Sequence, residues 1–362
     1  MDDKKTELLC IGNAIVDVFA NDDSGLVLRY GLCEPIQHIE IEKLKTILSE
    51  LGETTAVSGG GAANAAKVSG FLGAKVGFTG AIGGANPVGD DNSVGDEFGR
   101  LFGEDLKAAG VKTFLARKRS PTGLCLVLRT GGGTRIAASP SAALEFSEDD
   151  INEEEIKKAK VVLIDGFMLG RRGIVRHILT LVNKHGAAVA IDIGSAAIAA
   201  EEAEEIVSYV ALLNVSPDGV SSNARQLPFF LFMNEDEAVS FRNALGRTAA
   251  EIGQIRKFFK SLTEKSPSLV IVVKMGKRGA ICFAKGKAYN AGTDAVEPVE
   301  TTGAGDAFCG AFLTAWARGE SLPECVDLGN NAAKIVLGGA GTKVDKGAFK
   351  DLAALLDQSP DL

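Results

Sequence analysis

The sequence has no surplus of basic residues. Its 362 residues include 39 Lys and Arg against 47 Asp and Glu, and the formal net charge at pH 7 is −8. A chain with this balance has no excess positive charge with which to neutralise a phosphate backbone, so we expect no nucleic-acid partner. Any anionic ligand must be held locally, by loops and by the ends of helices.

A long apolar run is missing too. No stretch approaches the roughly 18 uninterrupted apolar residues that a membrane span needs. The N-terminus, Met-Asp-Asp-Lys-Lys-Thr-Glu, lacks the basic-then-apolar order of a signal peptide. With 46% hydrophobic and 24% charged residues, the composition is that of an ordinary globular protein. We therefore expect a soluble, cytoplasmic protein with no membrane partner.

The sequence also lacks the usual patterns of metal-ligating residues. Its cysteines are scattered, with no CxxC pair, and several lie in apolar runs: Cys10, Cys33, Cys125, Cys282, Cys309 and Cys325. We expect them to be reduced thiols with a structural role. The histidines, His38, His177 and His185, have no carboxylate or cysteine partner at ligand spacing, which argues against a histidine-based metal site.

What the sequence does contain is a regular alternation of strand-like and helix-like segments. From about residue 160, short apolar runs (161–165, 187–192, 227–233 and 269–273) alternate with longer amphipathic ones (235–245, 249–263, 306–318, 323–337 and 346–356). This alternation predicts an α/β fold in which helices cover both faces of a mainly parallel sheet. In the first third, residues 8–20 and 124–136 read as hairpins, so we expect a small antiparallel sheet inserted into this core.

The strongest local motif is Glu300-Thr-Thr-Gly-Ala-Gly-Asp306, a glycine-rich turn that opens into an apolar helix. Unpaired N–H groups and the positive end of the helix dipole would make this turn an anion site. Asp306 could there accept a proton from an attacking hydroxyl, or it could simply cap the helix. The spacing fits neither GxxxxGK[ST] nor GxGxxG, so a Walker-type or dinucleotide-binding loop is not supported.

A second glycine turn, Gly59-Gly-Gly-Ala-Ala-Asn64, also enters a helix. Its glycines would let a ligand approach the backbone, and Asn64 could bind hydroxyl groups, although helix packing alone would explain the pattern. Asn13 and Asp17 lie near the end of the first strand. Asp17 could accept hydroxyl groups of a ligand or cap a turn.

Two further motifs follow strands in the second half. Asn234 and Glu237 have the spacing of a helix cap, and they also stand at the carboxyl end of a parallel strand, where ligands bind in open α/β sheets. The run Lys274-Met-Gly-Lys-Arg-Gly279 could line a nucleotide cleft or turn a hairpin into residues 280–284.

In this order, the motifs resemble the ribokinase-like (PfkB) carbohydrate kinase family from residue 8 to about 356. The elements that match are Gly59, Gly60 and Asn64, the run Gly95-Asp-Glu-Phe-Gly99, the pair Asn234 and Glu237, and Thr302-Gly-Ala-Gly-Asp306. The resemblance implies one kinase domain over residues 1–362, with a three-layer Rossmann-like core. It also implies a small β-sheet lid, formed around 14–57 and 111–140, and a monomer or a homodimer through that lid.

The resemblance further implies a kinase that uses ATP and Mg²⁺ to phosphorylate a hydroxymethyl group of a nucleoside or sugar. Asp306 would be the catalytic base, and the amides of Gly303, Ala304 and Gly305 would form the anion hole. Substrate hydroxyls would meet Asn13, Asp17, Gly59, Gly60 and Asn64. The nucleotide would meet Asn234, Glu237, Lys274, Gly276, Thr302 and Asn330, with Glu237 acting on Mg²⁺ through water.

Within the family, Gly12-Asn13…Asp17 and Thr134-Arg135 look most similar to the adenosine kinase branch. There a lid arginine reaches the transferred phosphate, which makes Arg135 a candidate, with a solvated strand-end arginine as the alternative. Adenosine is therefore the expected acceptor. A sugar kinase of the ribokinase or fructokinase type, or a catalytically silent nucleoside-binding protein, are the alternatives.

Three features depart from the family pattern. Glu300 stands where the family usually has Asp, which leaves open whether a monovalent cation activates the protein. Residues 84–94 read as an insertion, and Gly61-Ala-Ala63 is more apolar than is usual at that place.

Overall fold

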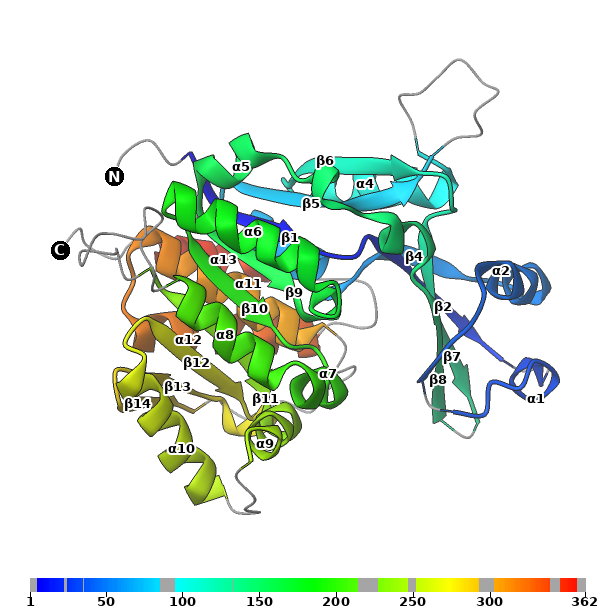
Figure 1. The fold of residues 1–362 in the computed structure, drawn as a ribbon. Coiled ribbons are helices and arrows are strands. Elements are labelled where there is room, and N and C mark those ends of the chain that lie inside the picture. The colour runs from blue at the N-terminus through cyan, green and yellow to red at the C-terminus, as the bar shows by residue number, and fades with distance from the viewer. Residues whose placement is uncertain are drawn as a thin grey trace.

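The chain folds into a large and a small β-sheet, and some helices pack against both sheets (Figure 1). A computed structural model describes residues 5–22, 25–34, 36–84, 95–131, 133–213, 227–246, 252–292, 303–338 and 346–356. Within these residues, no helix combines the length and the apolarity that crossing a membrane requires.

The large sheet has nine strands in the order β14-β13-β12-β11-β10-β9-β1-β5-β6 among the described residues. Its strands from β12 to β6 run parallel, and β13 and β14 add an antiparallel edge. The bounds are β1 Thr6–Ile11, β5 Val76–Gly83, β6 Lys112–Lys118, β9 Ala159–Asp165, β10 Ala188–Asp192, β11 Phe229–Asn234, β12 Leu269–Lys274, β13 Ala280–Ala284 and β14 Lys287–Ala291.

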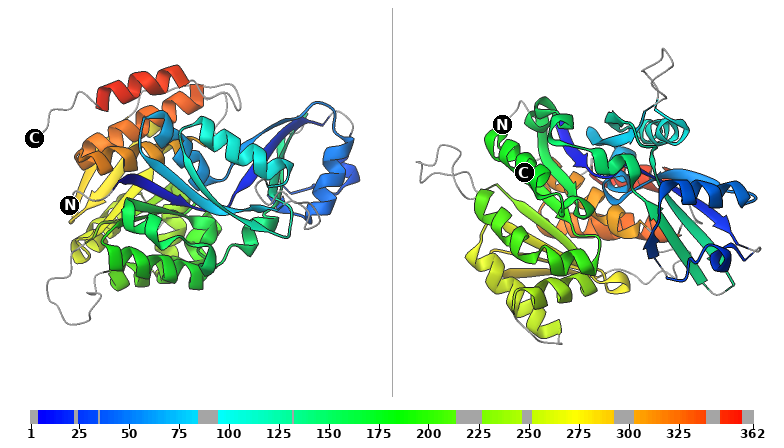
Figure 2. Two further views of the ribbon diagram at one scale, coloured as in Figure 1. Left: turned by 90° about the horizontal axis from the view of Figure 1, so that it is seen from above. Right: turned by 45° about the vertical axis from the view of Figure 1, so that its right-hand side comes forward.

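Helices cover both faces of this sheet, which confirms the predicted α/β architecture (Figure 2). One face carries α3 Gly61–Phe71, α4 Glu97–Ala108, α11 Ala304–Arg318, α12 Leu322–Gly338 and α13 Lys346–Leu356. The other carries α5 Glu153–Lys158, α6 Arg172–His185, α7 Ala196–Glu201, α8 Ala203–Leu213, α9 Glu235–Ala244 and α10 Ile252–Lys265. Short 3₁₀ turns complete the core: η1 Ser141–Glu145, η2 Glu148–Asp150, η3 Gly166–Met168 and η4 Gly276–Arg278.

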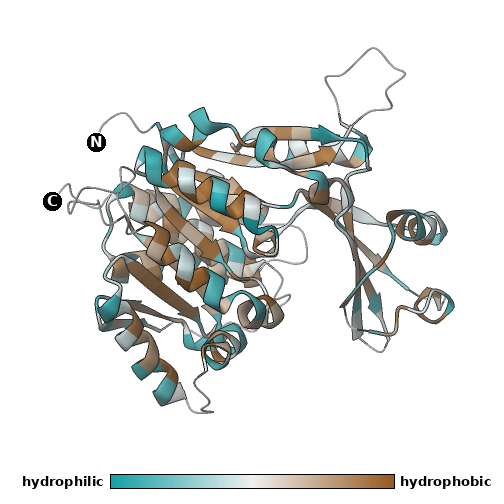
Figure 3. Cartoon of the chain, viewed as in Figure 1, coloured by the Kyte–Doolittle hydropathy of each residue, from teal (hydrophilic) through white to brown (hydrophobic). Residues whose placement is uncertain are grey.

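The middle strands of the large sheet are almost continuously apolar because helices cover both of its faces. In β1, Leu8 and Cys10 pack into the core on one face, while Leu9 and Ile11 pack into the core on the other. Because successive side chains point to opposite faces, a strand covered on both sides has no polar alternation. The buried strands in the middle of the large sheet are accordingly mostly brown in Figure 3, while the edge strand β6 and the covering helices also carry hydrophilic residues.

The small sheet projects from the large one, with two helices on its outer face (Figure 1). Its strands, in the order β3-β8-β7-β2-β4, are β2 Ile15–Asn21, β3 Ile36–His38, β4 Thr55–Gly59, β7 Gly123–Thr130 and β8 Gly133–Ser139. The helices are α1 Leu26–Arg29 and α2 Ile41–Glu50.

The structure corrects three details of the predicted small sheet. The sheet is mixed and not antiparallel throughout, because β2 pairs parallel with β7 and β3 pairs parallel with β8. Residues 8–20 do not form a hairpin, because β1 belongs to the large sheet and β2 to the small one. The second predicted lid segment, 111–140, begins too early, because β6 pairs with β5 in the large sheet. The hairpin of β7 and β8 is confirmed.

Candidate active site

Four polar residues end adjacent parallel strands at one edge of the large sheet. Asp165 ends β9, Asp192 ends β10, Asn234 ends β11 and Lys274 ends β12. The carboxyl edge of an open α/β sheet is where ligands bind. Asn234 and Lys274 are among the site residues predicted from the sequence. Both aspartates are not, although each directly follows an apolar run just as Asn234 does.

The predicted anion hole lies at the beginning of α11. Gly303 precedes the helix with a φ of +82°, a left-handed conformation that glycine adopts at little cost. The first intrahelical bond runs from the amide of Ala307 to the carbonyl of Gly303 (2.9 Å). The amides of Ala304, Gly305 and Asp306 therefore have no acceptor within the helix, and they lie at its positive end.

Asp306 stands in the first turn of α11 and meets α3. The side-chain amide of Asn64 donates to Oδ2 of Asp306 over 2.9 Å. The other oxygen, Oδ1, lies close to Gly61, where a Cβ would come within 3.3 Å of it. The two glycine turns, which are more than 200 residues apart in the sequence, thus form one site.

Several charges act on Asp306. Burial raises its pKa above the ordinary range, and the nearby Asp192 raises it further. The hydrogen bond from Asn64 and the positive charges of Lys274 and Lys67 oppose that rise. A carboxylate with a raised pKa is a stronger base than one in water, which suits proton abstraction.

The glycine turn before α3 is held against Asp17 and Asn13. A Cβ on Gly59 would fall 2.1 Å from Oδ2 of Asp17, so the carboxylate lies directly on this backbone. Gly60 has a φ of +91°, and a Cβ there would fall 2.5 Å from the carbonyl oxygen of Asn13. The structure therefore brings Asn13, Asp17, Gly59, Gly60 and Asn64 together.

A lysine that sequence reasoning missed lies beside this group. Lys67, one turn after Asn64 on α3, donates to the carbonyl of Ser58 (2.6 Å) and pairs with Asp105 at 3.6 Å. Burial lowers the pKa of Lys67, while Asp105, Asp17 and Asp306 oppose this. Its ammonium group thus lies within electrostatic reach of both the predicted substrate contact Asp17 and the predicted base.

Asn13 is itself held by a second missed residue. Arg171, which precedes α6, donates to Oδ1 of Asn13 over 2.8 Å and to the carbonyl of Ala143 over 2.7 Å. This fixes the orientation of the Asn13 amide. The neighbouring Asp165 accepts from the amide of Phe167 at 3.0 Å, and burial raises its pKa to about 6.

Asn234 and Glu237 form a complete capping box at the beginning of α9. Asn234 donates through N and Nδ2 to the two oxygens of Glu237, and the amide of Glu237 donates to Oδ1 of Asn234, at 2.8 to 2.9 Å. Burial raises the pKa of Glu237, partly opposed by the hydrogen bond from Asn234 and by Lys274. Since both carboxylate oxygens are already engaged, the pair suits an ion held through water better than one bound directly. No cluster of three or more metal-ligating side chains occurs in the described ranges.

Lys274 lies beneath the beginning of α11. Its Nζ donates to both oxygens of Asp192, at 2.8 and 2.9 Å, and lies 3.6 Å from Sγ of Cys309. A Cβ on Gly305 would come within 3.2 Å of the same nitrogen. The charged end of Lys274 therefore faces the anion hole.

The strand register separates Arg135 from the other predicted residues. Arg135 pairs with Leu128, whose side chain is in the core beneath α1 and α2. Asp17 pairs with Cys125, three positions earlier on β7, and so lies on the opposite face of the small sheet. This placement does not support the predicted contact between Arg135 and the transferred phosphoryl group. The arginine on the face of Asp17 is Arg129, whose guanidinium carbon lies 5.9 Å from the ring centre of Phe19.

The remaining predicted nucleotide contacts are spread along the same edge. Gly276 begins the 3₁₀ turn after β12, and this turn makes the hairpin into β13. Asn330 on α12 donates to the carbonyl of Ala291 over 3.2 Å. Thr302, Glu300 and residues 85–94 of the predicted insertion at 84–94 lie outside the described residues.

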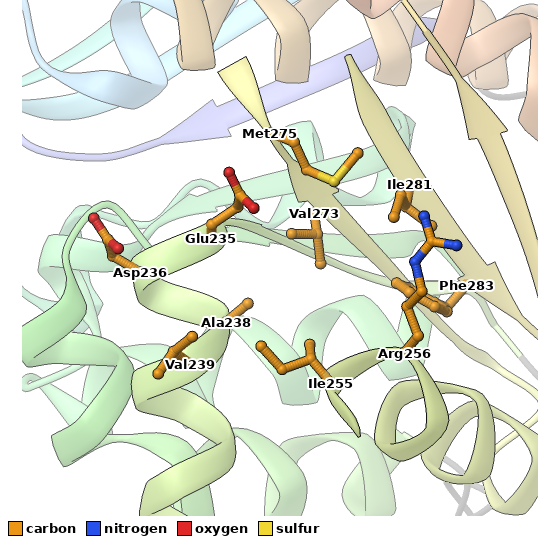
Figure 4. A pocket seen from close by; sticks show the side chains of 10 residues that line it. All are labelled: Glu235, Asp236, Ala238, Val239, Ile255, Arg256, Val273, Met275, Ile281 and Phe283. Carbon is orange, nitrogen blue, oxygen red and sulfur yellow. The ribbon is translucent and has the colours of Figure 1, made fainter. Parts of the chain in front are cut away.

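A separate cavity of about 480 Å³ lies on the other face of the sheet, between α9, α10, β12 and β13 (Figure 4). Its floor is apolar, with Val273, Ile281 and Phe283, and Glu235 and Arg256 lie at its rim. It contains none of the predicted site residues and touches the site only through the neighbours of Asn234 and Lys274.

Comparisons with known proteins show which family this chain is similar to. The model of the pfkB family carbohydrate kinases matches residues 5–346. An adenosine kinase of Schizophyllum commune is 26% identical over 350 residues, covering 91% of this chain and 94% of the relative. A 5-dehydro-2-deoxygluconokinase of Halalkalibacterium halodurans is 24% identical over 310 residues, covering 83% and 85%.

Solved structures share the fold. The adenosine kinase from Sinorhizobium meliloti matches with a TM-score of 0.74 at 22% identity, covering 98% of this chain and 99% of that one. A probable sugar kinase from Rhizobium etli matches with a TM-score of 0.75 at 21% identity, with the same coverage. Because the family match extends over nearly the whole sequence, this chain belongs to the pfkB family of carbohydrate kinases, which are phosphotransferases with an alcohol group as acceptor.

Proposed function

We propose that this chain transfers the γ-phosphoryl group of ATP to the hydroxymethyl oxygen of a nucleoside, with adenosine as the best candidate. The observation that carries the proposal is the contact between Asn64 and Asp306, 2.9 Å long, at the open end of α11. This contact joins a carboxylate with a raised pKa to the beginning of α11, where the first amides have no acceptor within the helix, and these are the parts that deprotonation and charge stabilisation require.

In this proposal each group of the chain has a distinct task. Asp306 accepts the proton of the acceptor hydroxyl, and Asn64 keeps the carboxylate oriented toward it. The amides of Gly303, Ala304 and Gly305 stabilise negative charge on the transferred phosphoryl group. Asp17, Asn13 and the turn at Gly59 and Gly60 bind acceptor hydroxyls.

When bound, Mg-ATP would supply the phosphoryl group, and the metal would offset its charge. The residues fit that ligand, because the first amides of α11 have no acceptor within the helix and Glu237 could orient metal-bound water from the beginning of α9. Asn234 holds Glu237 in place. Gly276, Asn330 and Thr302 are proposed to line the nucleotide site.

One observation favours a nucleoside over a simple sugar. Phe167, directly after β9, is 54% exposed, and its ring packs against Gly194, where a Cβ would come within 3.0 Å of it. An exposed aromatic ring at the carboxyl edge of the sheet is a surface on which a base can stack. A sugar acceptor is the second candidate, because the similarity to a 5-dehydro-2-deoxygluconokinase is nearly as high as that to an adenosine kinase.

The test is to incubate the protein with Mg-ATP and a panel of adenosine, other nucleosides, ribose, fructose and phosphosugars, and to measure ADP release. We expect adenosine to give the highest kcat/KM. Asp306→Asn should lower kcat by roughly 10²- to 10⁴-fold and leave acceptor binding largely intact.

Other outcomes would separate the alternatives. If the protein phosphorylated only a sugar, that sugar would take the place of adenosine as the proposed acceptor. Tight nucleoside binding without ADP release would identify a silent binding protein. Unchanged turnover in Asp306→Asn would remove Asp306 from the role of base.

A further inference from the structure

The buried ion pair of Lys274 and Asp192 has no task in the mechanism described so far. Both side chains are only 16% exposed. Keeping a lysine charged in such a place is unfavourable unless a carboxylate and further polar contacts compensate for the lost water. Here Asp192 accepts two hydrogen bonds from one ammonium group, and Cys309 lies next to both partners.

The geometry directs this charge at the anion hole. The ammonium group packs against Gly305, whose missing side chain leaves room for it: a Cβ there would stand 3.2 Å from Nζ. Cys309, one turn further along α11, donates to Oδ2 of Asp192 over 3.1 Å and so ties the pair to the same helix. The positive charge therefore lies directly behind the unpaired amides, in a region largely removed from water.

We propose that Lys274 is an electrostatic element of the anion hole, which stabilises the transferred phosphoryl group, and that Asp192 is the positioning residue that holds Lys274 there. This inference rests on the proposed kinase function. It moves Lys274 from the base and ribose of the nucleotide to the phosphate end. Charge placed in advance where negative charge develops is effective in a dry site, because no solvent must reorganise during the reaction.

The same pair acts on the predicted base in opposite directions. Charged or titratable groups face Asp306 from the elements packed against it: Lys67 on α3, Asp165 at the end of β9, Asp192 at the end of β10, Lys274 on β12 and Cys309 on α11. Lys274 lowers the pKa of Asp306, whereas Asp192 raises it. Removing one partner should therefore move the acid limb of the pH profile in a direction that depends on which partner is removed.

The kinetic test compares Lys274→Met and Asp192→Asn, using the acceptor that wild type turns over. Lys274→Met should lower kcat by at least about tenfold and change the acceptor KM little. This loss should be smaller than the roughly 10²- to 10³-fold loss of kcat that follows removal of a direct oxyanion donor. The acid limb of kcat/KM should move to higher pH in Lys274→Met and should not move upward in Asp192→Asn. Lys260→Met, which changes an exposed lysine on α10, is the control and should behave as wild type.

A double variant separates electrostatics from folding. Lys274→Met alone leaves a buried aspartate uncompensated and can lose stability for that reason. Lys274→Met with Asp192→Asn removes both charges, so stability should recover relative to Lys274→Met while kcat stays low. Recovery of kcat together with stability would overturn the proposal, because the lysine would then serve only the fold.

A binding measurement tests the inference without turnover. Calorimetry with Mg²⁺ and a non-hydrolysable ATP analogue, with Mg-ADP as the reference, should show that Lys274→Met weakens the triphosphate more than the diphosphate. Equal losses for both ligands, together with an unshifted acid limb, would overturn the role of Lys274. A wild type that releases no ADP would instead count against the proposed function, and the binding comparison would still decide the inference.

Discussion

Buried charge controls the behaviour of single residues at the carboxyl edge of the large sheet. Asp165, Asp192 and Asp306 lie close enough for their charges to interact, and Lys67 and Lys274 are the nearby cations. Such clusters of shifted pKa values are typical of functional sites. They also make the stability of the fold depend on pH.

Asp165 allows the clearest prediction of this dependence. Burial raises its pKa from 3.8 to about 6, so between these pH values the folded chain holds a proton that the unfolded chain has lost. Stability must then fall as pH rises through that window, by about 3 kcal/mol in all. Denaturant unfolding at several pH values between 4.5 and 7.5 should show a smaller fall for Asp165→Asn than for wild type.

The control for this experiment is Asp351→Asn, which changes an exposed aspartate on α13. Its pH profile should run parallel to that of wild type. An equal fall in Asp165→Asn and wild type would show that Asp165 does not hold the extra proton.

A second residue-scale prediction concerns the turn before α3. A Cβ on Gly59 would stand 2.1 Å from Oδ2 of Asp17, so Gly59→Ala must displace the carboxylate. If Asp17 binds acceptor hydroxyls, losing a charged hydrogen bond should raise the acceptor KM by roughly 10- to 100-fold. Gly52→Ala is the matched control, because nothing lies within 4 Å of a Cβ there. Equal KM values for the two variants would contradict the role of Asp17.

At the scale of elements, the site depends on the close packing of α3 and α11. A Cβ on Gly310 of α11 would stand 2.3 Å from the carbonyl oxygen of Ala65 on α3, next to Asn64. The hydroxyl of Ser69 also donates to the carbonyl of Gly310, over 3.1 Å. The small residues therefore set the distance between the two helices that carry Asn64 and Asp306.

Gly310→Ala should consequently affect stability and activity together. Overpacking should destabilise the fold by about 1–3 kcal/mol, and separation of the helices should stretch the contact between Asn64 and Asp306 and lower kcat. Gly103→Ala on α4 is the control: its new methyl group would meet Leu115 at 3.6 Å, an ordinary contact. That variant should gain up to about 1 kcal/mol from helix propensity. Thermal or denaturant unfolding and steady-state assays of both variants check this.

At the scale of the molecule, the two sheets share one continuous core. A single cluster of buried side chains runs from Leu126 and Val18 of the small sheet, through Phe102 of α4, to Phe230 and Phe312 of the large domain. Unfolding of either sheet would expose apolar side chains against which the other sheet packs. We therefore expect the chain to unfold in one cooperative transition.

The single tryptophan makes this prediction testable. Trp316 lies on α11 with its ring 5.0 Å from that of Phe230, so its fluorescence reports on the large domain, whereas far-ultraviolet circular dichroism reports on both sheets. The two unfolding curves in denaturant should coincide. Separate midpoints would mean that the small sheet unfolds on its own.

The sequence by itself determined the elements that local rules control. Short apolar runs that alternate with amphipathic ones predicted the parallel strands. The spacing of Asn234 and Glu237 predicted a helix cap that the structure contains. The motif order pointed to the kinase family, which the match over residues 5–346 confirms. These features could be predicted because they depend on residues close together in the chain.

Only the tertiary structure decided which distant residues meet. The turn of Asp306 by itself could not show which residues its carboxylate meets, and in the fold that carboxylate accepts a hydrogen bond from Asn64 on another helix. The strand register places Arg135 on the face of the small sheet opposite Asp17, because successive side chains of a strand point to opposite faces. The fold brings the charged side chains of Lys274, Asp192 and Lys67 close to Asp306. No spacing along the chain indicates that they lie there.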